Sequence, residues 1–204
     1  MWTGTWNPLN RADRVTADVT ALYVGGPVQP GGGPLLSSAG VVHSATARSG
    51  PLALGGLVTV YGANLAGTGR AATEVYLDGR SLPLLYTFSG QVNVQAPYDL
   101  AVNTQHQIMV RREDTLSVPD SLPLTTAQPG IFTKDLSGSG QGIVVKSDML
   151  TLAEPRTPAP RNEVIVLYAT GLGPVTPAVR AGEPALFSPL SATANPVTVT
   201  IVVR

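Results

Sequence analysis

The chain has 204 residues, of which only 13% are charged, and its basic and acidic side chains cancel to a net charge of zero. Without a basic cluster beyond Arg111–Arg112, the sequence lacks the positive face that nucleic-acid binding requires. The absence of cysteine excludes disulfides, thiolate zinc sites and cysteine nucleophiles. The 22 glycines and 18 prolines favour many short strands joined by turns over long helices.

Residues 1–39 are predicted to form an N-terminal arm. Trp2 and Trp6 lie among turn-forming residues. Anchoring this arm to the body of the protein is the preferred interpretation of the two rings, and a sugar-stacking platform is the alternative. Arg14–Val24 is rich in β-branched residues and predicts one strand. Gly25–Pro34 is too rich in glycine and proline to pack in a core, which indicates a linker.

A first compact unit is predicted over residues 40–127, because short apolar runs recur there at a spacing of roughly ten residues. This is the pattern of a β-sandwich. The predicted strands are Val41–Val42, Leu57–Tyr61, Glu74–Leu77, Leu82–Phe88, Gln91–Ala96, His106–Arg111 and Leu116–Thr126.

Asp78–Gly79 predicts a tight turn between two of these strands. Both central residues of a type I′ turn need a positive φ, which glycine adopts freely and aspartate tolerates. We therefore expect a hairpin that pairs Glu74–Leu77 with Leu82–Phe88.

The strand after this hairpin alternates strictly between polar and apolar residues. Its amide face carries Gln91, Asn93 and Gln95, and its apolar face begins with Val92 and Val94. A period of two predicts one buried face and one wet face. Apolar positions on this and other strands are predicted to be buried; they are Val58, Val60, Val92, Val94, Val164 and Val166.

A second unit is predicted over residues 128–204, because the segment Leu57–Leu65 resembles Val164–Leu172 in its order of apolar, tyrosine and small residues. The strands expected in it are Gly142–Lys146, Met149–Leu152, Glu163–Ala169 and Val197–Val203. The sequence stops before the last strands of this unit. An open sheet edge is therefore expected, to be filled by Val15–Val24 or by a second copy of the chain in a strand-exchanged homodimer.

Several segments together resemble the C-terminal domain family of large secreted proteins from Solibacter and other acidobacteria. The matching segments, in the family's order, are Val41–Thr46, Val58–Leu65, Val75–Leu100, Gln128–Thr133 and Val164–Val179. The resemblance implies an all-β fold of two tandem immunoglobulin-like units, similar to IPT domains, with the second unit incomplete. It also implies an extracellular or cell-surface location within a longer exported chain. The family has no known catalytic residues.

The amide side chains of Gln91, Asn93 and Gln95 are the first candidate site, because they lie about 7 Å apart on one strand face and can hydrogen-bond a sugar chain or a partner strand. Tyr86 and Tyr98 are candidates to flank that surface. The alternative is an ordinary solvated outer face.

Catalytic chemistry is only weakly indicated. His43 beside Ser44 and the separate His106 offer the imidazoles for nucleophilic catalysis, but a polar capping role for His43 and an exposed imidazole for His106 are the preferred interpretations. The carboxylates of Glu74 and Asp78 could form the acid pair of a glycosidase. The preferred interpretation is that Glu74 is solvated and that Asp78 belongs to the turn. No cofactor, metal site or membrane span is expected.

Three functional hypotheses are consistent with the sequence. The leading hypothesis is a non-catalytic immunoglobulin-like spacer or adhesion module. The second is a carbohydrate-binding module that uses the amide face and has polysaccharide as its partner. The third is a small hydrolase of esters or glycosides with a site near His43 or His106.

Overall fold

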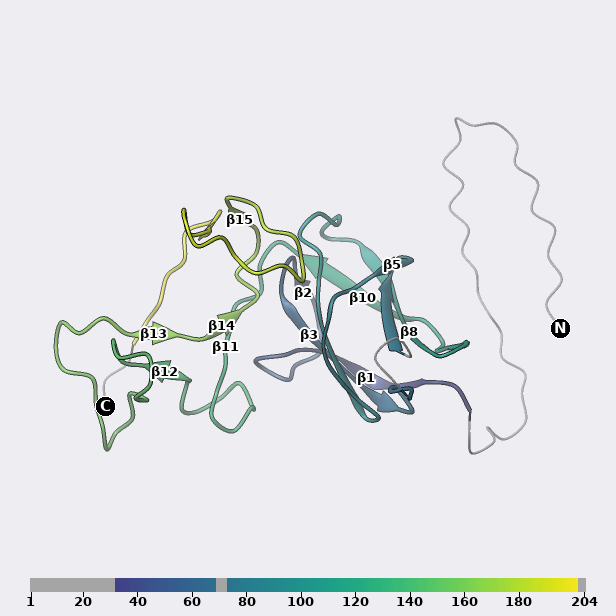
Figure 1. Ribbon diagram of the computed structural model, residues 1–204, viewed down its shortest axis with the longest axis horizontal. Helices are drawn as coiled ribbons and strands as arrows, with labels where there is room; N and C mark the ends of the chain where they lie inside the picture. Colours follow the sequence, from purple (N-terminus) through teal and green to yellow (C-terminus); the bar gives the residue numbers. More distant parts are fainter. Residues whose placement is uncertain (1–31, 69–72, 202–204) are drawn as a thin grey trace, which may run out of the picture. The chain divides into compact units, whose positions relative to one another are not determined.

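The computed structural model describes residues 32–68 and 73–201, and every regular element in these ranges is a β-strand (Figure 1). The prediction of an all-β chain is therefore confirmed for the described residues. The predicted strand Arg14–Val24 lies outside them. The first strand, β1 (Leu35–His43), begins inside the range predicted as arm and linker.

Two large sheets make up most of the regular structure. The first sheet is antiparallel, with β1 (Leu35–His43), β3 (Leu57–Ala63), β7 (Gln91–Gln95) and β6 (Leu84–Phe88) in that spatial order. The second sheet has the order β2 (Leu52–Ala53), β10 (Asp120–Thr125), β8 (Gln105–Arg112), β4 (Thr73–Leu77) and β5 (Arg80–Ser81), with β9 (Thr115–Leu116) also paired to β8. Only the short β2–β10 pair is parallel among these neighbours.

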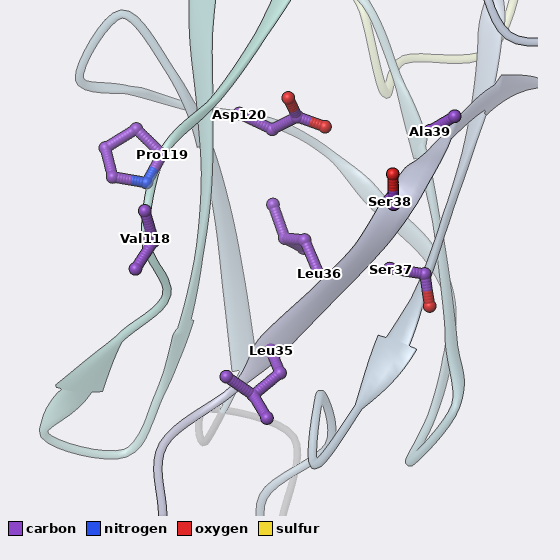
Figure 2. Close-up of a pocket in the computed structure, with 8 residues that line it drawn as sticks. All are labelled: Leu35, Leu36, Ser37, Ser38, Ala39, Val118, Pro119 and Asp120. Atoms are coloured by element: carbon purple, nitrogen blue, oxygen red, sulfur yellow. The ribbon is translucent and has the colours of Figure 1, made fainter. Parts of the chain in front are cut away.

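A break in register divides β1 into two halves. Leu36 pairs with Gly62 and Val41 pairs with Val60, so the residues between them have no Cα partner on β3. Figure 2 shows the resulting opening between this part of β1 and the residues that lead into β10. The bulge thus separates the buried end of β1 from its more exposed end, although both ends pair with β3.

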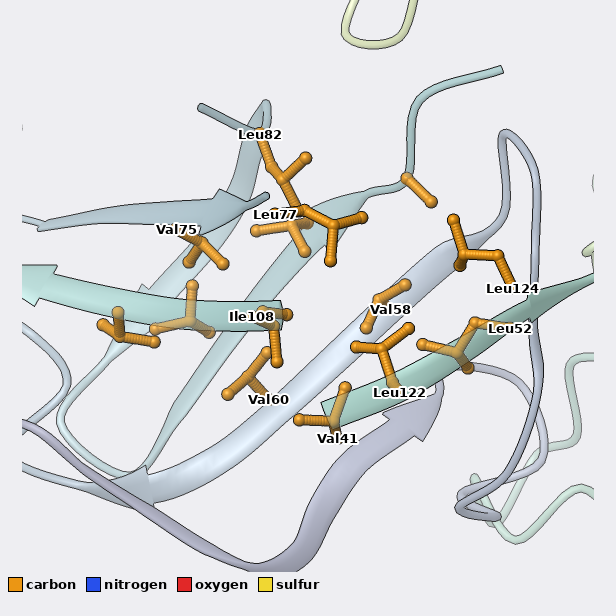
Figure 3. Packing of buried hydrophobic residues seen from close by; sticks show 14 of the residues in the cluster. Val41, Leu52, Val58, Val60, Val75, Leu77, Leu82, Ile108, Leu122 and Leu124 are labelled. Atoms are coloured by element: carbon orange, nitrogen blue, oxygen red, sulfur yellow. The ribbon is translucent and has the colours of Figure 1, made fainter. Parts of the chain in front are cut away.

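Both sheets bury their inner faces in one hydrophobic core (Figure 3). In the first sheet, Val58 pairs with Val94 and Val60 pairs with Val92, and all four side chains are buried as the alternation predicts. The second sheet contributes Val75, Leu77, Ile108, Val110, Leu122 and Leu124 to the same core. Two sheets that share one core are the arrangement of a β-sandwich. Each fully buried valine contributes roughly 1.5–3 kcal/mol.

The predicted turn at Asp78–Gly79 is present. Asp78 has φ of 50° and Gly79 has φ of 78°, and Leu77 pairs with Arg80 across them. The predicted partner strand was wrong, because only Arg80–Ser81 returns along β4. Leu82 then enters the core and the chain passes to the first sheet, where β6 pairs with β7. Pro83 supports this crossing, since it cannot donate to a ladder.

Residues 128–201 contain only short strand pairs in the described structure. These are β11 (Gly130–Ile131) with β14 (Ala169–Thr170), β12 (Val144–Val145) with β13 (Val166–Leu167), and β15 (Val175–Thr176) with β16 (Ala192–Thr193). Val145 is the one buried apolar side chain among the described residues of this segment. A second immunoglobulin-like unit therefore stays unconfirmed.

Several predictions for this segment were wrong in detail. Val164 is 72% exposed and Val166 is only half-buried. The strand predicted over Val197–Val203 is absent from its described part, where Val197 and Ile201 are exposed, and Met149 lies in a turn with a positive φ. Alternating apolar residues form a strand only where a neighbouring strand and a core receive them, and no described strand pairs with residues 197–201.

The register of β7 predicts a sharp contrast between adjacent substitutions. Val94→Asp would bury a carboxylate in the core and should lower the free energy of unfolding by about 4 kcal/mol or more. Asn93→Asp keeps a side-chain oxygen on the outer face and should cost under about 1 kcal/mol. Urea denaturation of both variants measures this difference. Equal losses would show that the register is incorrect.

Candidate functional site

The outer face of the first sheet brings aromatic and amide side chains together. Gln91 on β7 pairs with Tyr61 on β3 and with Phe88 on β6, and Asn93 pairs with Tyr86. Directly paired residues of antiparallel strands point to the same side of the sheet. Tyr61, Gln91 and Phe88 therefore form one row, and Asn93 and Tyr86 lie in the next. We call this set of residues the amide–aromatic face.

A bulge in β6 turns the two aromatic residues of that strand outward. Leu84 pairs with Val94 on the inner side, and the register then shifts so that Tyr86 pairs with Asn93. Leu85 is the additional residue. Without the bulge, Leu85 would stand beside Asn93 and Tyr86 would point toward the core, because a slip of one residue reverses every side chain.

The aromatic side chains of the face are open to solvent. Tyr61 is 40% exposed, Tyr86 is 50% exposed and Phe88 is 61% exposed. Tyr61 and Phe88 lie on strands two steps apart, which separates them by about 10 Å. Such rings can stack on flat, apolar surfaces of a ligand without a deep cavity.

The side-chain amides of Gln91 and Asn93, which lie between these rings, are hydrogen-bonded to each other. Gln91 Nε2 donates a hydrogen bond of 2.9 Å to Asn93 Oδ1. That bond leaves the Gln91 carbonyl oxygen and the Asn93 amide nitrogen to accept from and donate to a ligand. All side chains of the amide–aromatic face are uncharged, so the face favours a neutral, hydroxyl-rich ligand.

Gln95 lies on the same face of β7 as Gln91 and Asn93, but Gln95 and Tyr98 are both engaged in protein contacts. Gln95 Nε2 donates to the Gly55 carbonyl at 3.1 Å, and Gln95 Oε1 accepts the Gly182 N–H at 2.7 Å. The Tyr98 hydroxyl lies 3.4 Å from Gln95 Nε2, and its ring fills the space where a side chain at Gly55 would be. These contacts give Gln95 and Tyr98 structural roles.

Sequence reasoning missed Tyr61 and Phe88. The run Leu57–Tyr61 contains the signal for Tyr61, because the buried Val58 and Val60 place Tyr61 on the opposite face. Phe88 depends on the bulge in β6, which no local pattern indicated.

His43 is buried at the end of β1. Its Nδ1 accepts the Ala45 N–H at 3.2 Å, and its Nε2 lies 2.9 Å from the Gln128 carbonyl oxygen. This arrangement fits the neutral ring with the proton on Nε2. Burial lowers the pKa of His43 below its ordinary value. The ring therefore fastens residue 128 to the sandwich.

His106 is also buried, so the prediction of an exposed imidazole was wrong. Its Nδ1 lies 2.5 Å from Asp78 Oδ2 and its Nε2 lies 2.8 Å from the Ala101 carbonyl oxygen. Asp78 Oδ1 also accepts the Gln107 N–H. The carboxylate and the imidazole together hold the β4–β5 turn against β8.

The remaining carboxylates of interest are engaged at the surface. Glu74 contacts the hydroxyl of Tyr76 and the guanidinium of Arg111, and these hydrogen bonds lower the pKa of Glu74. The Glu74 side chain is partly exposed, and its pairing with Arg111 was not predicted. Glu113 accepts from Thr68.

Neither a metal site nor a membrane-spanning helix is found within residues 32–68 and 73–201. No cluster of histidine and carboxylate side chains in these ranges could hold a metal ion. None of the described residues forms a helix long and apolar enough to cross a membrane.

Comparisons with known proteins found matches among solved structures alone. No protein-family model and no curated protein matches the sequence. Among solved structures, the chain is similar to a gamma-CGTase from alkalophilic Bacillus clarkii, with 16% identity and a TM-score of 0.37. The match covers 48% of this chain and 13% of that chain, so this chain spans a small part of that protein.

The burial of His43 predicts an acid-sensitive contribution to stability. Because the pKa of the folded ring is lowered, the unfolded chain takes up more protons there as the pH falls below 6.5. The free energy of unfolding should therefore decrease as the pH falls from about 7.5 to about 5.5, more steeply than in His43→Asn, whose amide does not titrate. Urea denaturation across this range measures both slopes. Parallel slopes would contradict the predicted role, since His106 is common to both proteins.

Proposed function

We propose that this chain is a non-catalytic β-sandwich module that serves adhesion by binding a neutral polysaccharide through the amide–aromatic face. The observation that carries the proposal is the row Tyr61–Gln91–Phe88, with Asn93 and Tyr86 beside it on the same exposed face. Aromatic rings provide stacking surfaces and the amides provide hydrogen bonds to hydroxyl groups.

The shape of the face favours an extended ligand. The face belongs to a sheet surface, and its exposed rings lie on strands two steps apart, about 10 Å from each other. A polysaccharide chain laid across the strands would meet Phe88, the Gln91–Asn93 pair and Tyr61 in succession. A row of this kind suits an internal stretch of the polysaccharide.

The hydrolase alternative is not favoured by the surroundings of either histidine. His43 and His106 are both buried, and both ring nitrogens of each have protein partners. A general base must reach a substrate proton with a free nitrogen. These contacts support structural roles for both rings.

The exported setting of the module is part of the same proposal. It rests on the resemblance of the segments between residues 41 and 179 to the C-terminal domains of large secreted acidobacterial proteins. A module that attaches a long exported chain to polysaccharide combines the adhesion and carbohydrate-binding hypotheses. The tandem immunoglobulin-like organisation belongs to this proposal as well.

A glycan array tests the proposal. The protein should bind neutral glycans in preference to acidic ones, because the face carries no positive charge. Tyr86→Ala should weaken binding about tenfold through loss of a stacking surface, and Gln91→Ala with Asn93→Ala should weaken it at least as much.

Tyr168→Ala is the matched control, because Tyr168 is 45% exposed but lies outside the face. This variant should bind like the original protein. The absence of any glycan binding by the original protein, or equal losses in Tyr86→Ala and Tyr168→Ala, would contradict the proposal and leave a spacer role.

A further inference from the structure

A cleft with a volume of about 350 Å³ opens between β1 and the segment that enters β10 (Figure 2). One wall is Leu35–Ala39 and the other is Val118–Asp120. The Leu36 side chain lies between the walls, and the Asp120 carboxylate points from its wall toward β1. We call this space the lateral cleft. It is separate from the amide–aromatic face, and a ligand can occupy it whether or not that face binds glycans.

The β1 wall lacks a ladder partner on β3 from Ser37 to Ala39, whereas Leu35 and Leu36 are paired. Residues 37–40 fall in the register break between Leu36 and Val41. Ala39 has φ of 53°, in the left-handed region that non-glycine residues rarely adopt. Gly40 lies too close to the Tyr61 and Ser37 carbonyl oxygens for any side chain to fit. The surrounding structure therefore holds this bulge open, at a cost in backbone strain.

Among the described strands, none pairs with the outer edge of the β10 wall. Asp120–Pro123 pair with β8 on one side, whereas β2 reaches only Leu124 and Thr125 on the other. Within the described residues, the edge of Asp120–Pro123 away from β8 has no strand partner. The Ser121 N–H instead donates to Asp120 Oδ1 at 2.8 Å. The Asp120 carboxylate therefore accepts a hydrogen bond from the backbone N–H that an added strand would otherwise accept.

The lining of the cleft indicates what kind of strand would fit. Leu35 is 44% exposed and Val118 is 68% exposed, so both walls present apolar surface. Among the described residues that line the cleft, Asp120 is the only charged one. The serines at 37 and 38 add hydroxyl groups. The volume is near the lower limit for ligand pockets, which suits two or three residues of a peptide.

We propose that the lateral cleft binds a short extended peptide of a partner protein that carries a lysine or arginine with apolar residues two positions before and after it. The peptide adds a strand to the free edge of β10, and one of its carbonyl oxygens accepts the Ser121 N–H. Asp120 is thereby released from Ser121 and pairs with the basic side chain. The apolar side chains pack on Leu36 and Val118.

Fluorescence anisotropy with synthetic peptides tests this proposal on the full chain. The probe is a labelled, end-blocked peptide Val-Thr-Lys-Thr-Val, whose valines and lysine point to one side of an extended strand, and the control peptide carries glutamate in place of lysine. The lysine peptide should bind and the glutamate peptide should not. Asp120→Asn should weaken binding of the lysine peptide about tenfold, because the charge is lost while an acceptor for Ser121 remains.

A second pair of variants tests the location. Val118→Lys places a positive charge at the mouth of the cleft, where it repels the lysine of the peptide, and should abolish binding. Val164→Lys is its match, since Val164 is 72% exposed and lies outside the cleft, and it should bind like the original protein. Thermal melting confirms that all variants are folded.

Backbone amide shifts in NMR spectra give an independent readout. On addition of the lysine peptide, shifts should concentrate at residues 37–40 and 120–121. Lack of binding by the lysine peptide, equal binding of the two peptides, equal effects of the two lysine variants, or shifts confined to β6 would overturn the proposal. None of these outcomes depends on whether the amide–aromatic face binds glycans.

Discussion

The burial of Val92 and Val94 on β7 is the constraint on which the rest of the structure depends. β7 is paired on both sides, by β3 and by β6, and neither of these side chains has any exposed surface. A slip of one residue would put Gln91 and Asn93 into the core and cost several kcal/mol in unpaired polar groups. The core therefore determines which side chains form the outer face.

Two departures from regular strand structure, a turn and a bulge, place aromatic side chains on this outer face. The turn at Asp78–Gly79 ends β4 so tightly that Leu82 can enter the core and the chain can change sheets. The bulge at Leu84–Tyr86 then sets the outward direction of Tyr86. The Asp78–His106 contact fixes the turn that begins this path.

Local patterns predicted the parts of the fold that local chemistry decides. Alternation located β7 and its buried valines, and Asp78–Gly79 located the turn. His106 was misjudged because its burial depends on Asp78 and Ala101, which the sequence does not place beside it. Phe88 was missed because a bulge decides its direction. The apolar run from Val197 predicted a strand, yet its burial would require partner strands that are not found in the described structure.

The segment from residue 128 onward, which buries little apolar surface, depends on hydrogen bonds to one end of the sandwich. Gln128 contacts His43, the Leu57 N–H donates to Thr170 Oγ1, and the Gly182 N–H donates to Gln95. Gly171 has φ of 79° and lies against the Gln128 carbonyl and the His43 ring, where any side chain would clash.

His43 pairs with Val58, and Leu57 pairs with Gln95, so these contacts lie together at one end of β1, β3 and β7. The row Tyr61–Gln91–Phe88 lies at the opposite end of β3 and β7. The same strands therefore hold the C-terminal segment at one end and expose the amide–aromatic face at the other. In the described structure, the contacts of the C-terminal segment therefore leave Tyr61, Tyr86 and Phe88 exposed.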